Sequence, residues 1–229
     1  DDRQLRQDIG EMLLVGFRGL EISSQSTIVR DMRQYHVGSV ILFEYDAPSG
    51  THHRNVSSPD QLKKLCDQLK HEYRQACEAN KVDQLPLLIG IDQEGGKVCR
   101  MQVKDGFPYV PSHRSSAQQG IGSVEAAAQT AAQMLAAAGV NFDFAPVADV
   151  DVNPDCPVIG RLERSFSADT QEVANCCSVW LTQLRKQNVV GCLKHFPGHG
   201  SAYGDTHMGL VDVSTTWQQY ELYPYRKLI

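Results

Sequence analysis

Residues 194–207, KHFPGHGSAYGDTH, concentrate titratable side chains in a glycine-rich stretch. Asp205 and His207 are two residues apart, so in extended backbone their side chains point to the same side. A carboxylate in that place can accept the imidazole N–H, fix the tautomer and make the other ring nitrogen a better base. The spacing therefore indicates a metal-free Asp–His acid/base pair as one interpretation of this loop.

Two other interpretations of the loop are open at this level. Its histidines could be solvated side chains of a surface loop. The loop could instead bind zinc, because imidazole nitrogens and carboxylate oxygens are common zinc ligands. The candidate ligands are His195, His199, Asp205 and His207. A zinc hydrolase of this kind predicts bound metal and a loss of activity on adding a chelator.

Two further stretches carry charged side chains that suit polar ligands. IDQEGGKVCR (91–100) contains Asp92 and Arg100, and VIGRLERSFSAD (158–169) contains Arg164. Guanidinium groups bind hydroxyls and carboxylates well, and carboxylates accept hydrogen bonds from hydroxyls. The two stretches also contain glutamates that we expect to form salt bridges rather than to act in catalysis: Glu94 and Glu163.

Apolar segments that predict strands alternate along the chain with segments that predict helices. The predicted strands are residues 13–17, 37–43, 86–92, 140–150 and 189–196, with 207–214 as a sixth. The predicted helices are residues 4–14, 28–35, 58–79, 122–139, 169–187 and 217–229. This alternation is typical of an α/β fold with a parallel sheet.

Polar residues gather where the predicted strands end, which is typical of the active face of a (β/α)8 barrel. An open α/β sheet with its ligand at the switch point is the alternative. A barrel of this type usually needs roughly 250 residues, and the chain has 229. We therefore expect residues 1–229 to form one domain, a barrel truncated after about six strands, with the remainder supplied by downstream sequence.

Composition excludes several classes of protein. A net charge of −5 and a pI near 5.9 argue against a nucleic-acid binder. No apolar run approaches the roughly 20 residues that span a bilayer. The seven cysteines contain no CxxC motif, which favours reduced thiols and a cytoplasmic location. The alternative location is periplasmic or secreted, with a leader removed.

The three polar stretches, in this order, resemble glycoside hydrolase family 3, in particular its β-N-acetylglucosaminidase branch. The resemblance covers essentially the whole chain and corresponds to the family's N-terminal catalytic barrel. KHFPGHG followed by D-x-H is its most specific part, because the family's β-glucosidases lack that loop. Two mild departures are Lys97, where the family often has Arg, and Thr206, where Ser is usual.

The resemblance implies a retaining exo-β-N-acetylglucosaminidase that hydrolyses terminal β-linked N-acetylglucosamine through a covalent glycosyl-enzyme. It implies a small carbohydrate substrate, an oligosaccharide or a peptidoglycan fragment, and neither metal nor cofactor. Asp205 and His207 would form the acid/base dyad. The family's sugar-binding positions match Asp92, Arg100, Arg164, Lys194 and His195.

The resemblance places the family's nucleophilic aspartate well downstream of the dyad. Asp212 lies only five residues after His207, too early for that later strand. We therefore expect residues 1–229 alone to be inactive. A non-catalytic sugar-binding module is the remaining alternative, and it predicts that the full-length protein also lacks a downstream carboxylate.

Overall fold

The computed structural model describes residues 2–83 and 85–229, which divide into two compact units. Unit 1 comprises Asp1–Ile91, Arg100–Phe107 and Leu135–Phe142, and unit 2 comprises Asp92–Cys99, Pro108–Met134 and Asp143–Ile229. The main sheet has the strand order β1 (Leu14–Gly16), β2 (Ser39–Ile41), β5 (Leu88–Ile91), β8 (Phe142–Asp143) and β9 (Val190–Gly191). The boundary between the units falls within β8.

Unit 1 is built on parallel strands that carry apolar side chains on both faces. In the register of β1, β2 and β5, Val15 pairs with Val40 and Val40 with Ile89. The helices of this unit are α1 (Asp2–Glu11), α2 (Thr27–Tyr35) and α3 (Pro59–Asn80). Strands buried on both faces read as continuous apolar runs, as residues 37–43 do.

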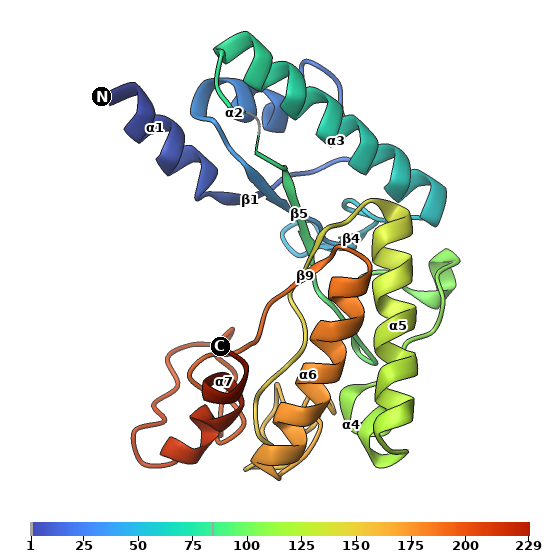
Figure 1. The fold of residues 1–229 in the computed structure, drawn as a ribbon, viewed down its shortest axis with the longest axis vertical. Helices are drawn as coiled ribbons and strands as arrows, with labels where there is room; N and C mark the ends of the chain where they lie inside the picture. Colours follow the sequence, from blue (N-terminus) through green and yellow to red (C-terminus); the bar gives the residue numbers. More distant parts are fainter. Residues whose placement is uncertain (1, 84) are drawn as a thin grey trace. The chain divides into compact units, whose positions relative to one another are not determined.

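The helix α3 begins where the sequence predicts, at Ser58 followed by Pro59. The Ser58 hydroxyl accepts the main-chain N–H of Gln61 at 3.2 Å, and a proline at the first helical position needs no N–H partner. In Figure 1, α2 and α3 lie side by side, and Arg33 of α2 pairs with Glu72 of α3 at 3.0 Å.

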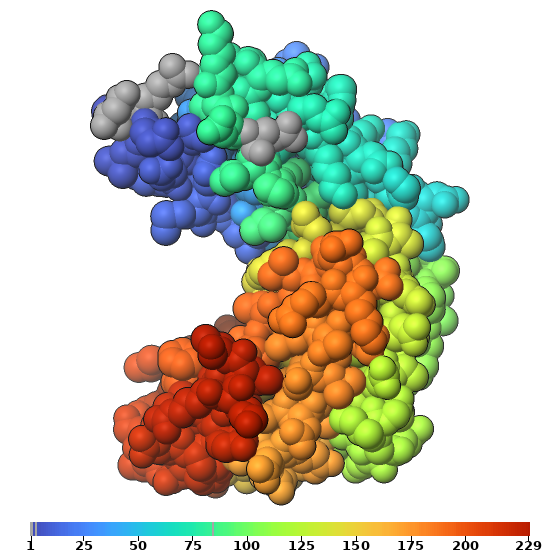
Figure 2. Space-filling view, viewed as in Figure 1, coloured from blue at the N-terminus to red at the C-terminus, as the bar shows by residue number. Residues whose placement is uncertain are grey.

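Unit 2 contains the helices α4 (His113–Gln118), α6 (Thr170–Lys186) and α7 (Tyr223–Leu228), and most of α5 (Ile121–Ala138). The Asp169 carboxylate caps α6 by accepting the N–H of Gln171 at 2.7 Å. Trp180 of α6 is fully buried. Helices α6 and α7 contact each other, as the orange and red surfaces in Figure 2 show. No described helix is long and apolar enough to cross a membrane.

Short elements occupy the stretches between the main strands and helices. Two antiparallel hairpins are β3 (Tyr45–Asp46) with β4 (Thr51–His52), and β6 (Gln93–Gly95) with β7 (Val98–Cys99). Two 3-10 helices are η1 (Val103–Asp105) and η2 (Gln219–Leu222). The hairpins and α4 are not among the elements predicted from the sequence.

The predicted class, α/β with parallel strands, is confirmed, but one predicted strand is wrong. Residues 207–214 form turns and irregular loop instead of a strand. The main-chain N–H of Met208 donates to the Asp205 carbonyl, and that of Ser214 donates to the Asp212 carboxylate. Leu210 is fully exposed, whereas Val211 and Val213 are partly buried and pack against a buried apolar cluster of unit 2. The predicted helix at 217–229 is η2 followed by α7, and Pro224 stands in the first turn of α7.

Gly200 gives a test of how residues 194–207 pack. A Cβ at this position would overlap the carbonyl oxygen of Val150, which is backbone and cannot swing aside. We expect Gly200→Ala to lower the free energy of unfolding by about 2 kcal/mol or more, measured by urea denaturation. Gly122→Ala is the control, because Gly122 lies in helix α5 and a Cβ at this position meets nothing within 4 Å. The control should leave stability unchanged or raise it by up to about 1 kcal/mol; equal effects of the two substitutions would contradict this packing.

Candidate active site

Four of the predicted sugar-binding residues meet in unit 2 around one buried carboxylate, that of Glu94 in β6. Arg164 binds Glu94 with both ends of its guanidinium, Nε to Oε2 and Nη2 to Oε1, each at 2.8 Å. Lys194 Nζ lies 2.6 Å from Glu94 Oε1 and 2.8 Å from Asp92 Oδ1. His195 Nε2 lies 3.0 Å from Nη2 of Arg164. We call these five residues, Asp92, Glu94, Arg164, Lys194 and His195, the polar cluster.

Burial makes the charges of this cluster depend on one another. Glu94 is 2 % exposed; burial raises its pKa, but the hydrogen bond from Arg164 and the charge of Lys194 outweigh that and bring it from 4.5 to about 2. Burial lowers the pKa of Lys194, while Glu94 and Asp92 raise it, and the net direction is upward. The expectation that Glu94 forms a salt bridge is confirmed. Glu163 instead accepts the Ser112 hydroxyl at 2.9 Å, and it has no ion pair in the described part of the chain.

Asp149 fixes the start of the loop that follows β9. It is fully buried and accepts His195 Nδ1 at 2.6 Å, the His195 main-chain N–H at 3.1 Å and the His199 main-chain N–H at 2.8 Å. Neighbouring residues of a regular strand point to opposite faces. Here the peptide bond between Lys194 and His195 is cis, and both side chains join the polar cluster.

The predicted dyad is present as a hydrogen-bonded pair on the exposed part of the same loop. His207 Nδ1 lies 2.7 Å from Oδ1 of Asp205, which also accepts the main-chain N–H of His207 at 2.9 Å. These two bonds lower the pKa of Asp205. The His207 side chain is 80 % exposed and that of Asp205 31 %. No hydrogen bond or ion pair found among the described residues joins His207 to the polar cluster.

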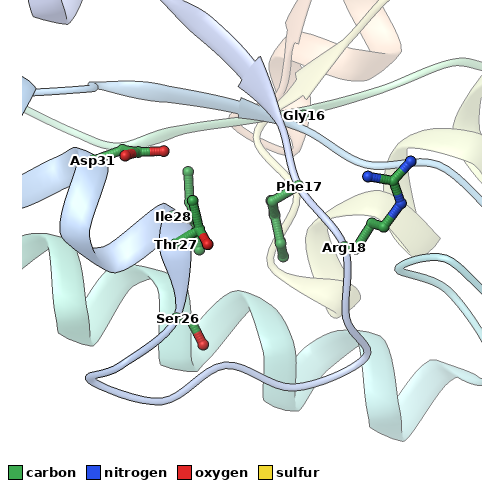
Figure 3. Close-up of a pocket in the computed structure, with 7 residues that line it drawn as sticks. All are labelled: Gly16, Phe17, Arg18, Ser26, Thr27, Ile28 and Asp31. Atoms are coloured by element: carbon green, nitrogen blue, oxygen red, sulfur yellow. The ribbon is translucent and has the colours of Figure 1, made fainter.

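Arg100 is the one predicted sugar-binding residue that belongs to unit 1. Its Nη1 lies 3.1 Å from Oε1 of Glu44, and its guanidinium lies 6.0 Å from the ring centre of Phe43. Unit 1 also holds a pocket of about 390 Å³, shown in Figure 3, where β1 ends and α2 begins. None of the predicted site residues lines it.

The geometry does not assemble the four ligands that the zinc interpretation requires. Within residues 2–83 and 85–229, no three His, Cys, Asp or Glu side chains form a group that could hold a metal ion. His195 is bound by Asp149, whereas His207 is bound by Asp205. His199 Nε2 faces the Thr206 hydroxyl at 3.5 Å.

Three buried polar residues support the cluster: Asp143, Asp149 and His113. Asp143 and His113 were not predicted as site residues. Asp143 Oδ1 accepts the N–H of Gln93 at 3.0 Å, and burial raises its pKa well above the usual range. His113 Nδ1 lies 2.8 Å from the Arg164 carbonyl, its ring stacks on Phe166, and burial lowers its pKa to about 4. The available signal was that Asp143 and Asp149 stand in an apolar strand sequence.

Glu94 and Asp143 give a matched pair of predictions on stability, because the pKa of one is lowered and that of the other raised. Because the pKa of Glu94 is lowered in the folded protein, its carboxylate stabilises the fold above pH 4.5, and this contribution is lost as the pH falls towards about 2. We therefore expect Glu94→Gln to lose about 3 kcal/mol of unfolding free energy at pH 7, and to lose progressively less between pH 4.5 and 2.

A raised pKa acts in the opposite sense, since its contribution is present at low pH and is lost as the pH rises. Asp143→Asn keeps an oxygen for the Gln93 N–H and replaces the carboxyl with a group that cannot ionise. It should be as stable as the wild type or more stable at pH 7. Urea denaturation from pH 2 to 8 measures both variants, and a loss at pH 7 in Asp143→Asn as large as in Glu94→Gln would contradict the assignment.

Comparison with known proteins places the chain in one family. Residues 4–229 match the family model described as glycosyl hydrolase family 3 N terminal domain. A beta-hexosaminidase of Thiobacillus denitrificans is 35 % identical over 208 residues, which cover 84 % of this chain and 50 % of that protein. A second beta-hexosaminidase, from Tolumonas auensis, is 33 % identical over 95 % of this chain and 59 % of its own length. The chain thus spans about half the length of the curated relatives it matches.

Solved structures agree with this assignment and with the predicted barrel fold. A glycoside hydrolase family 3 beta-N-acetylglucosaminidase from Paenibacillus sp. has a TM-score of 0.82 and 32 % identity, covering 97 % of this chain and 39 % of that chain. NagZ from Neisseria gonorrhoeae, in complex with N-trifluoroacetyl-D-glucosamine, has a TM-score of 0.77 and 26 % identity, covering 94 % and 59 %. The chain therefore belongs to glycosyl hydrolase family 3, and it matches the N-terminal domain of that family.

Proposed function

We propose that the protein to which this chain belongs is a retaining exo-β-N-acetylglucosaminidase that removes terminal β-linked N-acetylglucosamine from oligosaccharides or peptidoglycan fragments. The observation that carries this proposal is the hydrogen-bonded Asp205–His207 pair at the end of the KHFPGHGSAYGDTH segment. The beta-hexosaminidase and beta-N-acetylglucosaminidase names of its relatives support the substrate class.

His207 is suited to move the proton in this reaction. Its Nδ1 is held by Asp205, and its ring is mostly exposed, so Nε2 is accessible to a substrate. In the first step a carboxylate attacks the anomeric carbon, and Nε2 gives its proton to the departing glycosidic oxygen. In the second step Nε2 takes a proton from water, whose oxygen replaces the enzyme carboxylate at the anomeric carbon. Asp205 remains an acceptor for Nδ1, consistent with its lowered pKa.

The polar cluster is suited to hold the terminal sugar. The Lys194 ammonium group has three N–H donors, and two of them face Asp92 and Glu94. The third can donate a hydrogen bond to a sugar hydroxyl. Arg164 and His195 lie in the same hydrogen-bonded group, and Asp92 offers a carboxylate that accepts hydroxyl protons. Arg100 remains a predicted sugar-binding residue, because it matches the family's pattern.

The nucleophile is proposed to lie outside residues 1–229. The Glu94 carboxylate is paired with Arg164 and Lys194. The Asp149 carboxylate accepts hydrogen bonds from His195 and His199, so neither group is suited to attack the anomeric carbon. On this proposal the isolated chain is inactive. We also propose a cytoplasmic location, which the presence of seven cysteines without a CxxC motif supports; cell fractionation would test it.

The zinc hydrolase and the sugar-binding module are separated from this proposal by simple assays. The glycosidase hydrolyses an aryl β-N-acetylglucosaminide at its natural length and is insensitive to a chelator. A zinc hydrolase would lose activity with the chelator. A binding module would take up N-acetylglucosamine without hydrolysing the aryl glycoside at any length.

The dyad is tested by the leaving group of the substrate. We expect His207→Ala to lower kcat/KM by roughly 10²- to 10⁴-fold on an aryl glycoside with a poor leaving group. The loss should be much smaller with an activated leaving group such as dinitrophenolate, because that oxygen departs without a proton. Steady-state assays on both substrates measure the difference, and Asp205→Asn should follow the same pattern.

Asp212→Asn is the matched control for Asp205→Asn. Asp212 lies in the same loop and accepts the main-chain N–H two residues on, that of Ser214, at 2.8 Å, but it holds no histidine. The control should keep wild-type activity on both substrates. Equal losses of His207→Ala on the good and poor leaving groups would show that His207 is not the proton donor.

A further inference from the structure

Asp149 and His195 form another hydrogen-bonded Asp–His pair in which the histidine uses Nδ1, and its carboxylate is buried, so we call it the buried pair. Asp149 Oδ2 lies 2.6 Å from Nδ1 of His195, as Asp205 Oδ1 lies 2.7 Å from Nδ1 of His207. Asp149 is fully buried and the His195 side chain is 34 % exposed, against 80 % for His207. The two pairs therefore use the same ring nitrogen in very different surroundings.

A guanidinium occupies the outer nitrogen of the buried pair. His195 Nε2 lies 3.0 Å from Nη2 of Arg164. That guanidinium is fixed in place by Glu94 at 2.8 Å and by the Val158 carbonyl at 2.7 Å. A guanidinium can only donate hydrogen bonds. The nitrogen that faces it at this distance is therefore the acceptor.

The carboxylate on the other side of the ring imposes the complementary condition. Asp149 already receives the main-chain N–H groups of His195 and His199, at 3.1 and 2.8 Å. It is the acceptor in both bonds, and its remaining oxygen accepts in turn from the ring. Nδ1 of His195 must then carry the proton.

We propose that Asp149 and Arg164 together hold His195 as a neutral imidazole with its single proton on Nδ1, and that Asp149 is the positioning residue that sets this tautomer. No proton is then available at Nε2 of His195. For the glycosidase this leaves His207, and not His195, to protonate the leaving oxygen. That consequence rests on the proposed function, whereas the tautomer itself does not.

Counting charges gives the opposite expectation for His195. The carboxylates of Asp92, Glu94 and Asp149 outnumber the cations Lys194 and Arg164 by three to two, so a protonated ring would balance the group. A protonated ring would, however, direct its Nε2–H at a guanidinium N–H only 3.0 Å away. Two positively charged donors at that distance repel each other in a partly buried site. We therefore expect the contact with Arg164 to decide the state of the ring.

The test is a long-range ¹H–¹⁵N correlation spectrum of the ¹⁵N-histidine-labelled protein at its natural length and at pH 7, which distinguishes protonated from bare ring nitrogens. His195→Asn assigns the signals. The expected spectrum shows His195 protonated at Nδ1 only. In Asp149→Asn the amide NH₂ faces Nδ1 while Arg164 still faces Nε2, so the single Nδ1 tautomer should give way to a mixture of the two tautomers. Asp205→Asn, the same substitution in the other pair, should leave the His195 signals unchanged.

A wild-type spectrum with both His195 nitrogens protonated, or with the proton on Nε2, overturns the proposal. So does an Asp149→Asn variant that folds and keeps the proton on Nδ1 only. If that variant does not fold, the wild-type spectrum decides alone. If the spectrum is as expected but the protein hydrolyses no aryl β-N-acetylglucosaminide, the proposed function fails and the tautomer assignment stands.

Discussion

The buried carboxylate of Glu94 is the group on which the polar cluster depends. It receives two hydrogen bonds from Arg164 and one from Lys194, all at 2.6–2.8 Å, while it is itself 2 % exposed. Burying a charge is costly unless it is paired and hydrogen-bonded, so removing one partner leaves the others uncompensated. Through Arg164 and Lys194 this one carboxylate connects three segments that are far apart in the sequence, and through them it orders His195 and Asp92.

Close approach of backbone segments is the second constraint, and it explains why glycines stand beside the titratable groups. A side chain at Gly200 would overlap the Val150 carbonyl, and one at Gly95 would overlap that of Pro111. Gly95 also has a φ of +93°, which glycine adopts without strain. These glycines bring the loop after β9 and the β6–β7 hairpin against their neighbours in unit 2. The charged residues between them are thereby held at hydrogen-bonding distance.

Two Asp–His pairs have the same type of hydrogen bond, from Nδ1 of the histidine to the carboxylate, but they differ in burial. In the exposed pair, solvent can reach the outer nitrogen of His207, as the proposed proton transfer requires. In the buried pair, Arg164 donates a hydrogen bond to the outer nitrogen of His195. One oxygen of Asp149 accepts from the His195 ring, and the other accepts from two main-chain N–H groups. The same two residue types can thus serve as an acid/base pair or as a fixed hydrogen-bonding strut, depending on what faces the second nitrogen.

The sequence by itself determined the class of fold and most helices, because apolar periodicity and Ser58-Pro59 are local signals. It also predicted four of the five residues that the structure brings together in the polar cluster. It failed at residues 207–214, where an apolar alternation forms turns, since a strand also needs a neighbouring strand with which to pair. Which charges meet was decided only by the tertiary structure. Asp92 and Lys194 are 102 positions apart, and nothing local indicates that Asp149 rather than Asp151 would hold His195. Such pairings depend on which strand ends lie together and on how deeply each carboxylate is buried.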